Sequence, residues 1–548
     1  MEQINSKQLG ILRYALMIAQ RPAFCVFVFF LAFYYFTNAA IYKVGDETYV
    51  SIVAKQIARQ GQIGLKLSKP PNEEACVKGS NGLYYCKWGL GQSLVEVPFY
   101  FVHDIIWKPS PLKNGIIDLL SPRIISELML VFLAPSSVSA LGCVLVFLFS
   151  VRLGFSKRVA LALSLVYGLG TMVWPYSKSL MSDTTLNVAI LGSVYAAVSY
   201  VSTRHGRWLA ISGMCLGFAL VTKVTSVVIL PCLVIYVLLT IRSWRAMREL
   251  LIFFAPPFLA FLCLQFWHNA IRYGSVWQFG YHTGRDSMFG FCTPLYVGLW
   301  GLLASPGKSF FLYAPVTLLG LVSAKEFLRK RRPQAFLFLS VTLTYTILHA
   351  CWWAWAGDWA WGPRFLLVIT PYLILPTGLF FEKWTSRPRL HRILVSMLIV
   401  SSVSVQILGV AVHPFSFIEA RGQVVAQIVD KQQQDWHSYV WAYSENAFVN
   451  FSPVFSHITG NWWLLKHMFF SYDIWSDVPW RVMGDFKLAP LKWMNGNRTL
   501  PFWWPVAFSV TSPPARTWVY PLAAANFLVV FWWGLRLKRL FRDQSRQD

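Results

Sequence analysis

The chain has 548 residues, of which 56% are hydrophobic, 17% aromatic and 13% charged, and its mean hydropathy is +0.47. Apolar runs long enough to cross a bilayer recur from end to end, which excludes a soluble globular protein. The net charge of +25 does not indicate a nucleic-acid partner, because the basic residues form short clusters between apolar runs. We therefore predict an all-α, polytopic membrane protein.

The apolar runs predict about twelve transmembrane helices. No small-residue cleavage site follows the first run, so we expect it to stay as a span and not to be removed as a signal peptide. The predicted spans are 22–42, 124–151, 159–176, 184–202, 208–222, 225–241, 250–269, 309–325, 334–351, 364–381, 391–411 and 518–536.

Basic clusters set the predicted topology, because two apolar runs separate each cluster from the next. The positive-inside rule puts all the clusters and both chain termini in the cytoplasm. The loops then expected outside are 43–123, 177–183, 270–308, 352–363 and 412–517. Basic residues that fall in these outer loops are not explained by the rule and need another reason, such as an anionic ligand.

The first outer loop begins with two neighbouring carboxylates, Asp46 and Glu47. An ionised pair next to hydrocarbon is costly and suggests a function, although a solvated loop start is the alternative. Apolar residues recur at helical spacing from Glu47 to about Gln60, and Gly61 follows, so we predict a helix lying along the membrane surface. Its N-terminus favours ionised carboxylates.

A second amphipathic stretch, about 89–107, carries Glu96 and His103 and is expected at the interface and not across the membrane. Most of the nine cysteines lie in apolar runs. Cys76 and Cys86 instead lie ten residues apart in the first outer loop, where we favour a disulfide over two free thiols.

The region 412–517 is long and rich in Trp, Phe and Tyr, so we predict a small outer subdomain. Its aromatic side chains either present platforms for sugar rings or rest on the lipid headgroups.

Seven outer-face segments, read in order, resemble the GT-C superfamily of membrane glycosyltransferases, which use polyprenyl-phosphate sugars as donors. They are VGDETYVSIVAKQIARQGQIGL (44–65), GLYYCKWGLGQSLVEVPFY (82–100), SLMSDTTLNVAIL (179–191), GFALVTKVTSVVILP (217–231), HNAIRYGSVWQFGYHTG (268–284), GLLASPGKSFFLYAP (301–315) and WAGDWAWGPRFLLVITPYLILP (355–376). The likeness is to the bacterial branch related to protein mannosyltransferases and the lipid A aminoarabinose transferase. The loop that carries Cys76 and Cys86 is longer than in that pattern.

The resemblance implies a GT-C fold with surface helices in the first outer loop. Residues 1–411 form the catalytic transmembrane module, 412–517 the outer subdomain, and 518–548 the last span with a basic cytoplasmic tail. The implied activity is inverting transfer of a sugar to a hydroxyl of a glycan, lipid or protein. The implied location is a bacterial inner membrane with the active site facing the periplasm, and a monomer is expected.

The chemistry needs a base for the acceptor hydroxyl and cations for the leaving phosphate. Asp46 is the candidate base, with Glu47 as its alternative, and Asp183 orients a cation or the acceptor or simply caps a helix. Candidates for the donor phosphate are Arg364, Lys308, Arg272, Arg285 and Lys223. For each of these cations the alternative is snorkelling to headgroups.

Further substrate-binding candidates are Tyr84, Lys87, Tyr281, His282 and Trp361. No metal motif is evident and no cofactor is required, but Asp46, Glu47 and Asp183 supply ligands for one divalent cation if they converge.

The alternative function is a lipid-linked-sugar transporter or flippase. Such a protein carries ionisable residues at mid-membrane and similar halves, whereas here the ionisable residues cluster at the ends of the spans.

Overall fold

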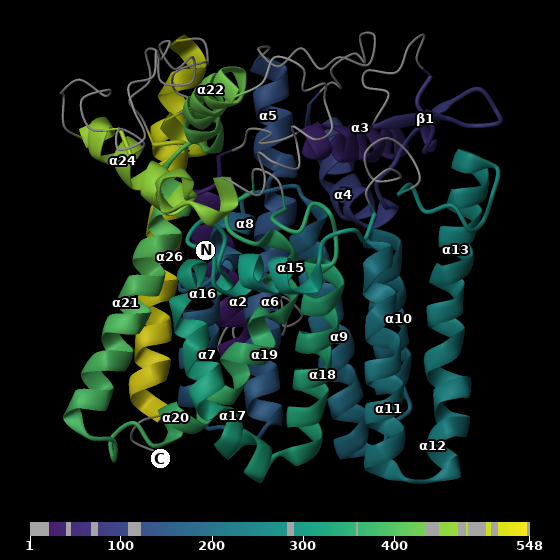
Figure 1. Cartoon of the computed structure of the whole chain (residues 1–548), viewed down its shortest axis with the longest axis vertical. Helices are drawn as coiled ribbons and strands as arrows, with labels where there is room; N and C mark the ends of the chain where they lie inside the picture. Colours follow the sequence, from purple (N-terminus) through teal and green to yellow (C-terminus); the bar gives the residue numbers. More distant parts are fainter. Residues whose placement is uncertain are drawn as a thin grey trace, which may run out of the picture.

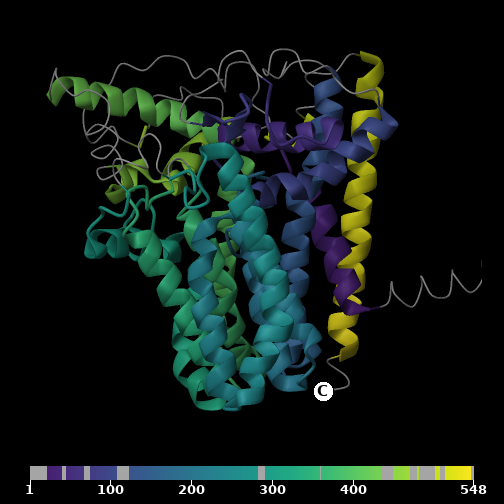
Figure 2. The ribbon, with the colours of Figure 1, turned by 90° about the vertical axis from the view of Figure 1, so that its right-hand side faces the viewer.

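The computed structural model describes residues 21–39, 45–66, 75–107, 122–281, 290–357, 360–432, 449–469, 478–479, 500–505 and 513–544. These residues form a bundle of long helices with shorter elements gathered at one end (Figures 1 and 2). The first elements are α2 (Pro22–Phe36), α3 (Gly45–Gln60), β1 (Cys76–Lys78), β2 (Tyr84–Cys86), α4 (Leu90–Ile106), α5 (Pro122–Val131), α6 (Leu133–Arg152), α7 (Lys157–Leu169), α8 (Val173–Tyr176), α9 (Ser182–Thr203) and α10 (Arg207–Thr222).

The chain continues through η1 (Val224–Val228), α11 (Ile229–Ile241), α12 (Trp244–Glu249), η2 (Leu250–Phe254), α13 (Ala255–Tyr273), α15 (Leu295–Leu303), α16 (Phe310–Tyr313), η3 (Pro315–Thr317), α17 (Leu318–Lys330), α18 (Arg332–Ala350), η4 (Arg364–Ile369), α19 (Thr370–Ile374), η5 (Leu375–Thr377), α20 (Gly378–Glu382), α21 (Arg389–Ala411), α22 (Pro414–Gln432), η6 (Pro453–Phe455), α24 (His457–Phe469) and α26 (Pro513–Gln544). The predicted all-α, polytopic membrane fold is confirmed.

Within the described residues, every predicted span coincides with helical structure, although several consist of more than one helical element. Within the described residues, seven helical stretches are long and apolar enough to cross a membrane, and α2 and α10 are shorter apolar helices. The predicted spans 159–176, 309–325 and 364–381 are each divided into short helical pieces. Proline explains the breaks, since Pro175, Pro315, Pro371 and Pro376 lie within them and a proline removes a backbone donor inside a helix.

The core of the bundle lies around α9, which packs against α6 and α10. Of the most apolar stretch of α9, 89% is buried inside the protein. A helix that is apolar on all sides is typical of such a central position. The first turn of α9 therefore stands at the end of the most enclosed helix, which gives that turn a rigid support.

The predicted surface helix is confirmed as α3, which lies across one end of the bundle (Figure 2). Its first turn carries Asp46 and Glu47, and Gly61 follows it with a φ of +64°. α4 packs beside it and is not among the described helices that qualify as membrane spans. α3 and α4 therefore lie together at this end of the bundle.

An ionic cluster fixes the second half of α3 to its neighbours. Lys55 Nζ lies 2.6 Å from Glu127 Oε1 of α5, and Arg59 Nη2 lies 3.0 Å from Glu127 Oε2. Arg59 Nε also donates to Asp104 Oδ2 of α4 at 2.6 Å, and His103 Nδ1 lies 3.0 Å from Asp104 Oδ1. We call these five residues the α3 ionic cluster.

The loop between α3 and α4 contains a two-stranded antiparallel sheet that the sequence analysis did not predict. β1 and β2 pair in the register Cys76↔Cys86, Val77↔Tyr85 and Lys78↔Tyr84. Glycine helps the turn between them, because Gly82 has a φ of +79°. The hairpin leads directly into residues 87–89, which enter the site described below.

The predicted outer subdomain has its own apolar cluster in the described parts of 412–517. α22, η6 and α24 contribute to it, and α24 packs on α21. Its buried side chains are Val412, Phe417, Ala420, Val424, Val425, Val449, Phe455, Trp463 and Leu464. These helices lie at the same end of the bundle as α3 (Figure 1), and the domain boundaries stay a prediction.

Candidate active site

A cavity of about 760 Å³ lies at the end of the bundle that carries α3. Segments far apart in the sequence build its wall, including the first turns of α3, α9 and η4, the connection from α10 to η1, and the ends of α13 and α18. The acidic, lysine and arginine side chains in this wall are Asp46, Lys87, Asp183, Lys223, Arg272 and Arg364. All six were candidates in the sequence analysis, so the structure brings these candidates together.

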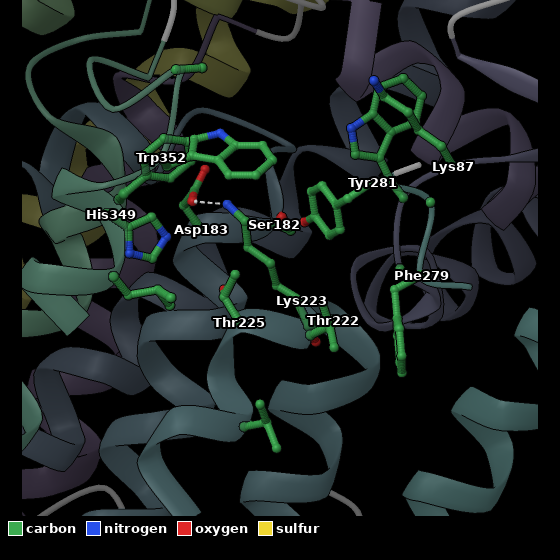
Figure 3. Close-up of a pocket in the computed structure, with 18 of the residues that line it drawn as sticks. Lys87, Ser182, Asp183, Thr222, Lys223, Thr225, Phe279, Tyr281, His349 and Trp352 are labelled. Carbon is green, nitrogen blue, oxygen red and sulfur yellow. Dashed lines mark hydrogen bonds and ion pairs between the residues drawn. The ribbon is translucent and has the colours of Figure 1, made fainter. Parts of the chain in front are cut away.

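Asp183 and Lys223 form an ion pair inside the cavity, with 3.2 Å between Asp183 Oδ1 and Lys223 Nζ (Figure 3). Asp183 lies in the first turn of α9, whose N-cap residue is Met181. The helix-cap alternative for Asp183 is therefore wrong. Lys223 lies where α10 ends and η1 begins, and its Nζ lies 4.3 Å from the centre of the Phe365 ring. Only 4% of the Asp183 side chain is exposed, so this carboxylate is held by its partner.

Asp46 and Arg364 face each other more loosely. Arg364 Nη1 lies 4.0 Å from Asp46 Oδ2 and 3.5 Å from Met181 Sδ. The Asp46 side chain is 40% exposed, whereas that of Arg364 is 10% exposed. The backbone before Arg364 is shaped by glycine, since Gly357 has a φ of +70° and an added Cβ there meets Arg364 Cγ at 2.7 Å. Asp46 is thus the more accessible of the two carboxylates in the cavity wall.

Glu47 turns away from the cavity, although it is the neighbour of Asp46. It is fully buried, and its Oε1 accepts hydrogen bonds from the Ser179 hydroxyl and, at 3.0 Å, from the backbone N–H of Leu180. Both donors precede α9 directly. Glu47 therefore ties the start of α3 to the segment that leads to Asp183. The three predicted acidic residues do not converge on one point, and the described residues contain no group of three or more acidic, His or Cys side chains placed to hold a metal ion.

Two of the other predicted phosphate-binding cations are bound to backbone carbonyls. The Arg272 guanidinium lines the cavity but donates to the carbonyls of Cys86, Lys87 and Trp88 through Nη1, at 2.9–3.2 Å. It thereby fixes the loop that carries Lys87. Lys308 is not part of the cavity wall, and its Nζ donates to the carbonyls of Ala360 and Gly362 at 2.8 and 3.3 Å. It supports the turn before Arg364 from behind.

Of the predicted substrate-binding residues, some line the cavity and others do not. Lys87 and Tyr281 line the cavity (Figure 3), whereas Tyr84 lies in β2 and forms a bridge with Leu65. Trp361 packs edge-on against Tyr313, with 5.0 Å between the ring centres, and is not part of the wall. His282 and Arg285 lie outside the described residues.

The sequence analysis missed His349, which lines the cavity beside Asp183 in Figure 3. Its Nδ1 lies 3.0 Å from the Tyr345 carbonyl, and its ring stacks on Phe365 at 4.7 Å. The available signal was a histidine at the outer end of the predicted span 334–351. Ser182, Thr222, Thr225 and Gln265 were also missed and add polar groups to the wall.

Cys76 and Cys86 are free thiols in the structure, so the predicted bond is not formed there. Their Sγ atoms lie 3.9 Å apart across the hairpin. Because the two residues are directly opposite in register, their backbones already bring the thiols together. The disulfide therefore stays a prediction for oxidising conditions.

The wall combines a charged end with an apolar side. Its two carboxylates and four Lys or Arg side chains leave a surplus of positive charge, which favours an anionic ligand. Leu220, Val224, Val227, Val228 and Leu348 form the apolar side. A ligand with a phosphate at one end and a hydrocarbon chain at the other matches both features.

Residues 111–267 match the family described as dolichyl-phosphate-mannose-protein mannosyltransferase. This stretch includes Asp183 and Lys223, and it confirms there the predicted resemblance to membrane glycosyltransferases. No curated protein matches the chain.

Among solved structures, the chain is similar to ArnT from Cupriavidus metallidurans. In the apo state the identity is 15% and the TM-score 0.45, with 84% of this chain and 79% of that chain covered. With undecaprenyl phosphate bound, the identity is 14%, with the same TM-score and coverage. The archaeal oligosaccharyltransferase AglB from Archaeoglobus fulgidus, in complex with an inhibitory peptide and a dolichol-phosphate, is 11% identical, with a TM-score of 0.39 and coverage of 88% and 61%.

Proposed function

We propose that the protein is an inverting glycosyltransferase that moves a sugar from a polyprenyl-phosphate donor to a hydroxyl acceptor. One observation carries the proposal: an accessible carboxylate, Asp46, faces the Arg364 guanidinium across a cavity that also holds the Asp183–Lys223 pair. The family match over residues 111–267 supports a donor of the same lipid-phosphate class.

In the proposed reaction, Asp46 accepts the proton of the acceptor hydroxyl as its oxygen attacks C1 of the sugar. The bond between C1 and the phosphate oxygen breaks, and the electron pair leaves with the phosphate. One displacement at C1 with one base inverts the configuration. The products are the glycosylated acceptor and the polyprenyl phosphate, and the proton remains on Asp46 until water removes it.

Arg364 and Lys223 are the proposed partners of the leaving phosphate. A guanidinium can bind two phosphate oxygens at once through its planar fork. Lys223 is followed along the chain by Val224 and Val228, which belong to the apolar side of the wall. A polyprenyl chain is proposed to run along that side, with the phosphate held between the two cations.

The sugar and acceptor are proposed to occupy the part of the cavity between Lys87, Trp88, Tyr281 and Trp352. Aromatic faces suit the apolar faces of sugar rings, and the lysine suits their hydroxyl groups. A hexose or a pentose fits this description, as does a glycan, lipid or protein hydroxyl. The site is proposed to face the periplasm of a bacterial inner membrane, and the basic clusters support its place on the side away from the cytoplasm.

The test is the variant Asp46→Asn, which keeps the shape of the side chain but cannot accept the proton. Release of polyprenyl phosphate is measured from polyprenyl-phosphate-linked hexoses and pentoses, with a cell-envelope extract as the acceptor. We expect turnover to fall by about two to four orders of magnitude. Binding of undecaprenyl phosphate, measured by native mass spectrometry, is expected to persist.

The matched control is the neighbouring variant Glu47→Gln, which keeps an oxygen that accepts from Ser179 and Leu180 and is expected to be mild. Near-normal turnover by Asp46→Asn together with loss of turnover in Asp183→Asn moves the base to Asp183. Movement of the intact donor across the membrane, with no release of polyprenyl phosphate by the unaltered protein, contradicts the transferase and supports the transporter alternative.

A further inference from the structure

The first half of α21 lies at the end of the bundle opposite α3 (Figure 1). A second hollow runs along it. It has a volume of about 690 Å³ and begins at Trp384, in the connection between α20 and α21. The residues that line it are Trp384, Arg389, Arg392, Ile393, Ser396, Met397, Val400 and Ser401. We call this hollow the α21 groove.

The α21 groove follows one face of the helix. Its lining residues recur three or four positions apart from Arg389 to Ser401, which places them on a single stripe. Twelve residues of α-helix extend about 18 Å, which is close to half of the roughly 30 Å hydrocarbon core of a bilayer. The length of the groove is thus about the thickness of one lipid leaflet. Arg389 and Arg392 lie at the end of the groove where α21 begins.

Within the described residues, the face of α21 that lines the groove is exposed, whereas Val395 on another face of this half is buried. The other half packs on its neighbours, where Ser402 Oγ accepts from the Val316 N–H at 2.6 Å and Gln406 Nε2 donates to the Tyr313 carbonyl at 2.6 Å. In the groove, by contrast, Met397 is 62% exposed and Val400 is 64% exposed. Both residues lie in a helical stretch that is long and apolar enough to cross a membrane, so this face is accessible to lipid.

Within the described residues, the side chains at the open end of the groove carry a net positive charge. Glu326 is shared by Lys330, Lys383 and Arg387, at 3.0, 3.0 and 3.9 Å. The other nearby carboxylate, Glu382, accepts from the backbone N–H of Ser156 at 2.6 Å.

Within the described part of the chain, no carboxylate partner is found for the two groove arginines, Arg389 and Arg392. The buried Nε of Arg392 has no hydrogen-bond partner there either. These two guanidinium groups are therefore available to an anion.

We propose that the α21 groove binds one anionic phospholipid, with its phosphate held by Arg389 and Arg392 and an acyl chain along Ile393, Met397 and Val400. Basic pockets beside membrane helices suit such headgroups, and an arginine fork suits a phosphate. Trp384 lies where an indole suits the boundary between headgroup and hydrocarbon. This site is separate from the proposed glycosyl transfer and does not depend on it.

The experiment measures lipid binding by native mass spectrometry on the full-length protein after delipidation. The probes are phosphatidylglycerol, phosphatidylcholine and undecaprenyl phosphate, added one at a time and in competition. The unaltered protein is expected to bind one phosphatidylglycerol more than tenfold more tightly than phosphatidylcholine. The double variant Arg389→Gln/Arg392→Gln is expected to lose roughly thirtyfold in affinity for phosphatidylglycerol, about fivefold for each arginine.

The matched control is Arg329→Gln/Arg332→Gln, which removes two exposed positive charges at the same end of the bundle but away from the groove. It is expected to bind phosphatidylglycerol like the unaltered protein. A further variant, Ser396→Trp, fills the groove without changing its charge and is expected to lose the lipid as well.

Unchanged phosphatidylglycerol affinity in the arginine double variant overturns the proposal, and so does an equal loss in the control. Tighter binding of undecaprenyl phosphate than of phosphatidylglycerol, lost in Ser396→Trp, overturns the assigned occupant.

Discussion

α3 contributes Lys55 and Arg59 to the α3 ionic cluster and Asp46 to the cavity wall, and these charged side chains differ in how exposed they are. In the cluster, Lys55, Arg59 and Glu127 are joined at 2.6–3.0 Å, and their side chains are at most 10% exposed. In the cavity, Asp46 is 40% exposed and lies 4.0 Å from Arg364. α3 thus carries buried, ion-paired side chains in its second half and an exposed carboxylate, Asp46, in its first turn.

The difference in exposure separates charges that hold α3 in place from those that we propose to act on the substrate. In the cluster, burial alone raises the pKa of Asp104, but the hydrogen bonds and charges of Arg59 and His103 outweigh it and hold that pKa below its usual value. Its ionised form is therefore already satisfied by neighbours. A carboxylate with such partners cannot readily take a proton from a substrate, whereas Asp46 remains open to the cavity. The cluster instead fixes the direction of α3, and with it the place of Asp46.

The largest expected effect comes from breaking the cluster with Glu127→Gln. Lys55 and Arg59 then lose a carboxylate that both contact, and a buried charge without its partner is strongly destabilising. We expect the free energy of unfolding to fall by about 3 kcal/mol, measured by denaturant-induced unfolding in detergent.

The control for this variant is Glu326→Gln, which removes a carboxylate from an ion-pair network whose side chains are 30–52% exposed. Exposed pairs contribute less than about 1 kcal/mol, so little change is expected. Equal effects of the two variants contradict the distinction between the two regions.

The sequence predicted the helices and most of the cavity because both rest on local patterns. Apolar runs define spans, and the start of α3 follows from its amphipathic spacing and its flanking glycine. The charged residues that line the cavity were also candidates: Asp46, Asp183, Arg272 and Arg364 from their predicted place on the outer face, and Lys87 and Lys223 from the segments that resemble the GT-C superfamily. The breaks in three spans follow from prolines that were visible in the sequence.

The roles of neighbouring residues were not predictable in the same way. Asp46 and Glu47 differ by one position, which on a helix is a rotation of about 100°. One faces the cavity and the other is buried against Ser179, and only packing decides which. Lys308 is similar, because an outer-face lysine can reach a ligand or a backbone carbonyl, and the fold directs it to Ala360.

The pH dependence of stability gives a second prediction. It concerns Glu96 of α4, which contacts α3 between the α3 ionic cluster and the cavity. Burial raises the pKa of the Glu96 carboxyl to about 8 from an ordinary value of 4.5, hydrogen bonds from Ser51 and Gln92 oppose this rise, and the Glu47 carboxylate adds to it. In the folded protein Glu96 thus keeps its proton over a range in which the unfolded chain has lost it. Stability is therefore fully present below about pH 4.5 and declines as the pH rises through about 8.

The expected slope is up to about 1.4 kcal/mol of unfolding free energy for each pH unit in that window. The variant Glu96→Gln has no proton to lose, so its stability is expected to decline less between pH 5 and about pH 8. Unfolding measured at a series of pH values checks this. Glu326→Gln is the control, since hydrogen bonds from Lys383 and Lys330 hold the pKa of Glu326 below its usual value. A profile for Glu96→Gln identical to that of the unaltered protein would show that Glu96 is ionised in the fold.

The smallest expected effect comes from exchanging arginine for lysine in each region. Arg364→Lys keeps the charge of the cavity but removes the planar fork, so we expect the affinity for undecaprenyl phosphate to fall about tenfold with little change in stability. Arg59→Lys removes the fork that binds both oxygens of Asp104, at 2.6 and 2.7 Å. It is expected to lower the free energy of unfolding by about 1 kcal/mol and to leave lipid-phosphate affinity unchanged. For both variants, native mass spectrometry measures the affinity for undecaprenyl phosphate and denaturant unfolding measures the free energy of unfolding. If Arg364→Lys binds lipid phosphate normally while Arg59→Lys does not, the accessible charges of the cavity are not the phosphate site, and the ligand depends on the orientation of α3 instead.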